Sequence, residues 1–189
     1  MFACGNLMPL ARAGKAGHIA AMPQLSTRAA CLVCVLAAGA ALGIALASEY
    51  WGGLAPCALC LWERVPYRFA ILFGVLGFLL PGRLVPREWA LCLVLLAAVA
   101  AAGLAFVHVG VEQGFWPSPL PECAAKLASF GSIAERLAAM PAMPAKPCDE
   151  PTYLIPAIPL SMAAMNLVFA LAFAACIAIY LGNKRGRKP

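Results

Sequence analysis

Four long apolar runs constrain this chain more than any other feature of its sequence. They cover residues 29–48, 61–80, 89–109 and 160–181. A helix of about 20 residues is about 30 Å long, which matches the hydrocarbon core of a bilayer. Hydrophobic residues make up 63% of the chain and charged residues 12%, which excludes an ordinary water-soluble globule. We therefore expect an all-α membrane protein, a bundle of four transmembrane helices formed by one membrane domain over residues 29–182.

The second run is the least regular of the four. It carries Arg68 and stops at Pro81, so its most apolar part is short for a membrane span. We expect its helix to begin near Cys57 and to include the polar turn before Val65.

The positions of Lys and Arg predict the orientation. Nine of them lie beside the termini or in the connection between the second and third runs: Arg12, Lys15, Arg28, Arg83, Arg87, Lys184, Arg185, Arg187 and Lys188. The opposite side holds Arg64, Lys126, Arg136 and Lys146. The positive-inside rule then places both termini in the cytoplasm and residues 49–60 and 110–159 in the periplasm of a bacterium. The net charge of +6 is thus a topology signal of an inner-membrane protein, and we expect no nucleic-acid partner.

The two ends flank this domain. Residues 1–28 are expected to be a cytoplasmic extension, and residues 183–189 a basic cytoplasmic tail. Ala45-Leu46-Ala47 has the small-residue pattern of a signal-peptidase site. The apolar run before it exceeds the roughly 7–15 residues of a signal peptide, so we expect it to be retained.

The second periplasmic loop, residues 110–159, is rich in proline. Between its proline runs, Leu127, Phe130 and Leu137 recur at helical spacing. This pattern predicts a short amphipathic helix at the membrane interface. A helix packed on top of the bundle is the alternative.

The predicted topology sorts the nine cysteines. Five lie on the cytoplasmic side and are expected to stay reduced: Cys4, Cys31, Cys34, Cys92 and Cys176. The pattern Cys31-Leu32-Val33-Cys34 lies inside a span, where small side chains favour helix packing. Four lie on the oxidising side, and their even number permits two disulfides: Cys57, Cys60, Cys123 and Cys148.

The pattern Cys57-Ala58-Leu59-Cys60 differs from the buried one because Pro56 precedes it at the start of a helix. Free N–H groups and the positive end of the helix stabilise a thiolate there. Arg64 follows Cys60 by four residues and shares its helix face, so its cation favours the reactive form. Anchoring at the lipid headgroups is the alternative role for Arg64.

Taken in order, these motifs resemble the DsbB family of bacterial disulfide bond formation proteins over roughly residues 29–182. The motifs are Pro56-Cys57-Ala58-Leu59-Cys60-Leu61-Trp62-Glu63-Arg64, His108, Trp116-Pro117-Ser118-Pro119, Cys123, Cys148-Asp149-Glu150 and Ser161-Met162-Ala163-Ala164-Met165-Asn166. The resemblance implies a quinone-dependent thiol oxidase that reoxidises a periplasmic thioredoxin-like, DsbA-like oxidase. Its electrons would pass to a membrane quinone, ubiquinone or menaquinone.

The resemblance also implies roles for the cysteines. Cys123 and Cys148 would form the loop disulfide that receives electrons, with Cys123 bonding the partner. Cys57 and Cys60 would form the second disulfide, and Cys60 would touch the quinone. Exchange needs an accessible sulfur, and reduction of a lipid-soluble quinone needs a thiolate at the membrane surface.

Other residues keep more than one interpretation. His108 either contacts the quinone or carries its proton, or only stabilises the end of its helix. With Arg64 and Cys60 it completes the predicted quinone-binding set. Trp116 is typical of an interfacial anchor, and Glu63 either tunes Arg64 or faces water.

Three other functions compete with this one. A zinc or iron–sulfur site is disfavoured because Cys123 and Cys148 each lack a neighbouring cysteine, so no metal is expected. A quinone reductase of the vitamin K epoxide reductase type has its Cys-x-x-Cys on a late helix, whereas here it opens the second. The third alternative is a non-enzymatic membrane protein with structural disulfides.

Overall fold

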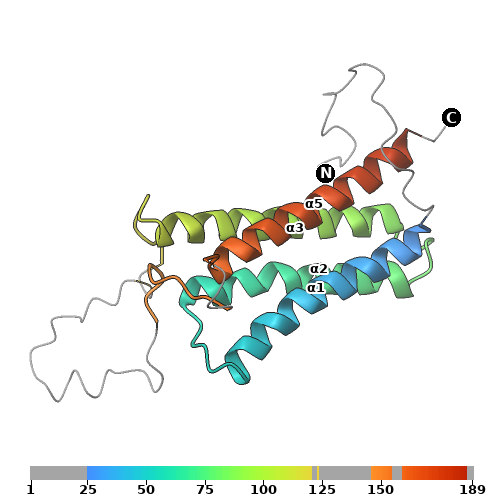
Figure 1. The fold of residues 1–189 in the computed structure, drawn as a ribbon. Helices are drawn as coiled ribbons and strands as arrows, with labels where there is room; N and C mark the ends of the chain where they lie inside the picture. Colours follow the sequence, from blue (N-terminus) through green and yellow to red (C-terminus); the bar gives the residue numbers. More distant parts are fainter. Residues whose placement is uncertain (1–24, 121–122, 124–145, 155–158, 187–189) are drawn as a thin grey trace, which may run out of the picture.

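The computed structural model describes residues 25–120, 123, 146–154 and 159–186. These residues form α-helices that run lengthwise beside one another (Figure 1), namely α1 (Thr27–Tyr50), α2 (Ala58–Leu79), α3 (Arg87–Glu112) and α5 (Met162–Arg185). The expected amphipathic helix near residues 127–137 and the extension before residue 25 lie outside the described residues. The all-helical class predicted from the sequence is confirmed.

Three of these helices are long and apolar enough to cross a membrane: α1, α3 and α5, with 24, 26 and 24 residues. Helix α2 has 22 residues and is not among them, because Glu63, Arg64 and Arg68 lie in its first half. Three candidate spans are thus established within the described residues, and a membrane crossing by α2 remains a prediction.

Helix α2 begins where the sequence indicated. Cys57 is its N-cap, with an extended backbone, and its sulfur accepts a hydrogen bond from the backbone N–H of Cys60 at 3.2 Å. Ser26 and Ser161 cap α1 and α5 in the same way through their hydroxyls. A side-chain acceptor at this position satisfies one of the free N–H groups of a first helical turn. The residue that starts α2 is therefore also a cysteine of the predicted redox pair.

Small residues let α1, α2 and α3 approach closely in the core. A Cβ placed on Gly77 of α2 would lie 2.7 Å from Cβ of Ala90 and 2.9 Å from Sγ of Cys31. Cys31 and Cys34 are both buried in this core, which is the packing expected for them. Close approach of small residues is a general means of joining helices in membranes.

The two ends of the bundle differ. At one end α1 begins and α5 finishes, since Tyr180 donates to the carbonyl of Leu25 at 3.1 Å and Lys184 donates to Thr27. At the other end, where α2 begins and α3 ends, lies a small buried cluster that includes Cys57, Cys123 and Cys148. The cysteines selected from the sequence therefore gather at the end opposite the described ends of the chain.

Candidate functional site

Two cysteine pairs meet at this end of the bundle. Cys123 and Cys148 are joined by a disulfide. Cys57 and Cys60 are free thiols with their sulfur atoms 3.0 Å apart. Cys57, Cys123 and Cys148 belong to one buried cluster, against which Cys60 packs. The arrangement places a disulfide and a dithiol within a single small volume.

Hydrogen bonds prepare Cys57 as a thiolate. The two sulfurs share a hydrogen bond in which the Cys60 thiol is the donor once Cys57 is ionised, and the backbone N–H of Cys60 also donates to Sγ of Cys57. These bonds hold the pKa of the Cys57 thiol below its ordinary value, although burial acts in the opposite direction. The first turn of α2, which Cys57 caps, thus supplies donors to its sulfur.

A chain of buried polar side chains leads from Cys57 into the bundle. Nε2 of His108 lies 3.5 Å from Sγ of Cys57. Its other ring nitrogen, Nδ1, lies 2.7 Å from Oε1 of Glu63, so an Nδ1–H donates to the carboxylate and leaves Nε2 free to accept. Asn166 donates to Oε2 of Glu63 at 2.7 Å, and Tyr67 donates to Oδ1 of Asn166 at 2.6 Å. Glu63 therefore holds an internal position between α3 and α5 and does not face water.

Arg64, the residue after Glu63 on α2, contacts α1 and is not part of this chain. Its guanidinium pairs with Glu49 at 2.6 Å and donates to the carbonyl of Ala45 at 3.4 Å. The side chain is 10% exposed, and its charge is paired within the protein. An ion pair with little solvent around it fixes the orientation of both side chains.

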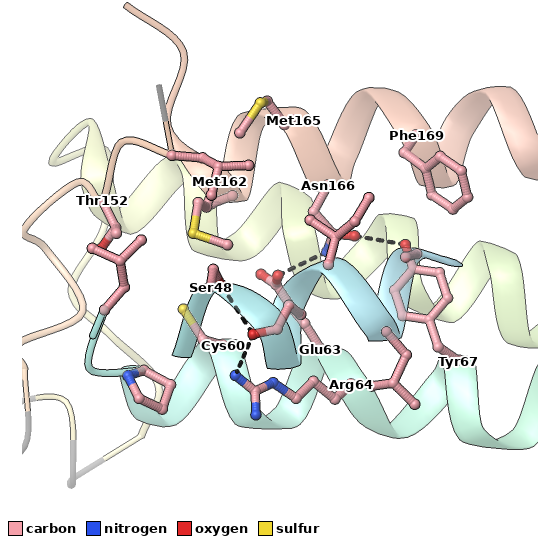
Figure 2. Close-up of a pocket in the computed structure, with 18 of the residues that line it drawn as sticks. Ser48, Cys60, Glu63, Arg64, Tyr67, Thr152, Met162, Met165, Asn166 and Phe169 are labelled. Atoms are coloured by element: carbon pink, nitrogen blue, oxygen red, sulfur yellow. Dashed lines mark hydrogen bonds between the residues drawn. The ribbon is translucent and has the colours of Figure 1, made fainter. Parts of the chain in front are cut away.

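A cavity of about 290 Å³ opens beside Cys60. Figure 2 shows Cys60, Glu63 and Arg64 on one wall and Asn166 and Phe169 on another. Most of its remaining lining is apolar, from α1, α5 and the segments before α2 and α5: Ala40, Ala41, Leu42, Ile44, Ala45, Leu54, Ala55, Pro56, Leu154, Met162, Ala163 and Met165. An apolar pocket with a few polar groups is typical of a small-molecule site.

The structure brings together most of the residues selected from the sequence. Cys60 and Arg64 line the cavity, whereas His108 is not among its lining residues and lies against Cys57 instead. The sequence analysis missed Glu49 and Tyr67 and gave Asn166 no role. A lone acidic residue at the end of the first run was the only signal available for Glu49.

Trp116 closes the outer end of α3. Its indole N–H donates to the carbonyl of Val107 at 3.0 Å. A Cβ on Gly110 would lie 1.9 Å from Cζ2 of Trp116, so only glycine leaves room for the ring. Trp116 also packs against the cluster that contains the cysteines, and therefore does more than anchor the chain at an interface.

Comparison with known proteins identifies a matching family. The family model described as disulfide bond formation protein DsbB matches residues 27–180. Disulfide bond formation protein B of Pasteurella multocida is 29% identical over 149 residues, 77% of this chain and 81% of that protein. The protein of the same name from Chromohalobacter salexigens is 32% identical over 100 residues, 52% of this chain and 58% of that protein. No solved structure matches the chain.

Proposed function

The chain belongs to the DsbB family, and from this membership we propose that it oxidises a periplasmic thioredoxin-like protein and passes the electrons to a membrane quinone. Membership makes it a membrane disulfide oxidoreductase, which sets aside the non-enzymatic alternative. The observation that carries the finer proposal is the position of Cys60. It packs against the cluster that holds the Cys123–Cys148 disulfide and also lines the apolar cavity.

The orientation follows from the charges. Both termini are cytoplasmic under the positive-inside rule. This topology needs α2 to cross the membrane together with α1, α3 and α5. The cysteine cluster then lies at the periplasmic end of the bundle, where a partner protein has access and disulfides persist.

Electrons enter at the loop disulfide. A thiolate of the partner attacks Sγ of Cys123, and the bond to Cys148 breaks and leaves a Cys148 thiolate. The partner's second thiolate then attacks the mixed disulfide, which releases Cys123 as a thiolate and leaves the partner oxidised. Cys123 and Cys148 reduce an oxidised Cys57–Cys60 pair by the same exchange, so two electrons move inward at each stage.

The cavity fits a quinone ring. Its apolar walls suit a lipid-soluble ring, and Cys60 and Arg64 supply polar contacts at one end. Ubiquinone or menaquinone would supply a two-electron, two-proton acceptor at this position. The ion pair with Glu49 holds Arg64 in place for that contact.

His108 acts as the proton acceptor for the cysteine pair. Because Nδ1–H is engaged by Glu63, Nε2 is the atom that accepts the thiol proton of Cys57. The Glu63 carboxylate stabilises the imidazolium that results. His108 is thus assigned to the cysteines, a role distinct from the quinone contact expected from the sequence.

Thiol trapping tests the proposal. Cys148→Ser is expected to accumulate a mixed disulfide with the oxidised form of a thioredoxin-like partner. The Cys123 thiolate attacks the partner's disulfide and releases one partner thiolate, and no Cys148 thiol remains to resolve the adduct. Cys123→Ser should form no such adduct, and Cys176→Ser should behave as the unmodified chain does. Without quinone the purified chain should oxidise only as much partner as its own disulfides can accept electrons from, and continued turnover should require added quinone. An adduct in Cys123→Ser, or pairs that stay oxidised without quinone, would contradict the proposal.

A further inference from the structure

The reduced cysteine pair and His108 have the composition of a metal site. Sγ of Cys57, Sγ of Cys60 and a ring nitrogen of His108 all lie within 4.8 Å of one another. Two thiolates and one imidazole are ligands that Zn²⁺ prefers, in sites that keep one position open. We propose that Cys57, Cys60 and His108 in the reduced chain bind one thiophilic divalent cation, such as Zn²⁺, and that this cation inhibits the oxidoreductase.

The separations of the ligand atoms suit tetrahedral coordination. Bonds of about 2.3 Å to sulfur and about 2.0–2.1 Å to nitrogen place the two kinds of atom about 3.6 Å apart around one ion. Cys57 and His108 are 3.5 Å apart already. The two sulfurs, at 3.0 Å, would separate to about 3.8 Å in such a site. Rotation of the Cys60 side chain would widen this separation.

The surroundings of His108 strengthen the assignment. A histidine that binds a metal commonly donates its other ring N–H to a carboxylate, which fixes the tautomer and the direction of the ring. Glu63 does this at 2.7 Å, and Asn166 in turn holds the second oxygen of Glu63. The carboxylate that commonly orients a metal-binding histidine is therefore already in place beside His108.

Charge and access also agree with a cation. A dication that displaces the two thiol protons gives a neutral complex with the thiolates, and a neutral complex is tolerated in a buried site. Cys60 lines the cavity, which offers a path for entry and a fourth ligand from solvent. Oxidation of the pair to a disulfide removes both thiolates, so only the reduced chain has this site.

Inhibition follows from this dependence on redox state. A cation that binds only the reduced pair stabilises that state. At about 100 times its dissociation constant, it shifts the equilibrium between the oxidised and reduced pairs about 100-fold toward the reduced pair. The inhibitory effect rests on the proposed function, but cation binding does not.

Cobalt titration tests the binding. The chain with Cys123→Ser and Cys148→Ser, reduced and freed of reductant, is expected to bind one Co²⁺ with thiolate charge-transfer absorption and tetrahedral d–d bands. Glu63→Gln should weaken binding about 10–100-fold, and His108→Ala should also change the spectrum. The matched control with Cys31→Ser and Cys34→Ser should retain the signal. An equal signal from the oxidised chain, loss of the signal in that control, or no effect of either His108→Ala or Glu63→Gln would overturn the site.

Turnover separates the site from the proposed function. Zn²⁺ should slow quinone-dependent oxidation of a dithiol by the unmodified chain, and a chelator should restore the rate. Cobalt binding by a chain that reduces no quinone would support the site and refute the proposed function. Undiminished turnover at zinc concentrations that saturate the reduced chain would refute the inhibition.

Discussion

Asn166 of α5 donates a hydrogen bond to Oε2 of Glu63 of α2 at 2.7 Å, although 103 positions separate them in the sequence. The other carboxylate oxygen of Glu63 pairs with His108 of α3. The Glu63 carboxylate thus joins α2, α3 and α5 next to the cysteine pair. Substitutions of Asn166 and Tyr67 can therefore measure how much this chain of hydrogen bonds stabilises the bundle.

Tyr67 and Asn166 should be coupled in stability. Tyr67→Phe and Asn166→Ala are each expected to lower the free energy of unfolding by about 0.5–2 kcal/mol, because each leaves a buried polar atom without its partner. The double variant should lose less than the sum, by about 0.5–1.5 kcal/mol. Denaturant unfolding in detergent measures the cycle, with Tyr153→Phe, at an exposed position, as the control. Strict additivity would show that the bond contributes nothing.

Arg64 should affect quinone use and not thiol exchange. Arg64→Ala removes a charged donor from the cavity wall, and the quinone KM is expected to rise about 10–100-fold, as for loss of a hydrogen bond to a charged group. Arg68→Ala is the matched control on the same helix, since Arg68 is exposed. Steady-state kinetics with varied quinone measures both. Adduct formation at Cys123 blocked by Arg64→Ala, with KM unchanged, would contradict the proposed order of electron flow.

Cys57 should ionise at lower pH than an ordinary thiol. Because Cys60 donates to its sulfur, the lowered pKa of Cys57 should rise again in Cys60→Ala, which removes the side-chain donor, and less in Cys60→Ser, which keeps one. The thiolate absorbance of chains lacking the remaining cysteines, followed against pH with a chelator present, measures this shift. An unchanged midpoint in Cys60→Ala would show that the bond between the thiols has no effect on ionisation.

Gly110 should tolerate no side chain. Gly110→Ala places a methyl group against Trp116, so the ring must move and the protein should be destabilised by about 1–3 kcal/mol. Gly103→Ala on the same helix has no atom within 4 Å of the added Cβ and should be neutral or slightly stabilising. Thermal unfolding and tryptophan fluorescence distinguish the two. Equal effects of both substitutions would argue against the contact with Trp116.

Local patterns predicted much of this molecule. The length of each apolar run indicated a helix, and Pro56 before Cys57 indicated where α2 begins. Both signals act within a few residues, because helix formation and capping depend on near neighbours in the sequence. The Cys123–Cys148 disulfide of the structure was suggested by family resemblance, since spacing alone permits other pairings.

Those local patterns could not predict contacts between helices that are distant in the sequence. Tyr67 and Asn166 are 99 positions apart, and each alone is an unremarkable polar residue in an apolar helix. Arg64 was selected because it follows Cys60 by one helical turn, but its ion pair with Glu49 depends on how α1 packs against α2. For His108 the sequence left open a quinone contact, a proton carrier or a helix-end role, and its position 3.5 Å from Sγ of Cys57 depends on the packing of α3.

The polar chain through Glu63 also bears on how the bundle assembles. Apolar helices inserted in a bilayer have little to fix their vertical alignment, because lipid and helix surfaces are similarly apolar. A shift of α5 along α2 by one turn, about 5.4 Å, would separate Asn166 from both Glu63 and Tyr67. These bonds therefore select one register among several that the apolar faces would accept, and that register aligns the cavity wall on α5 with Cys60.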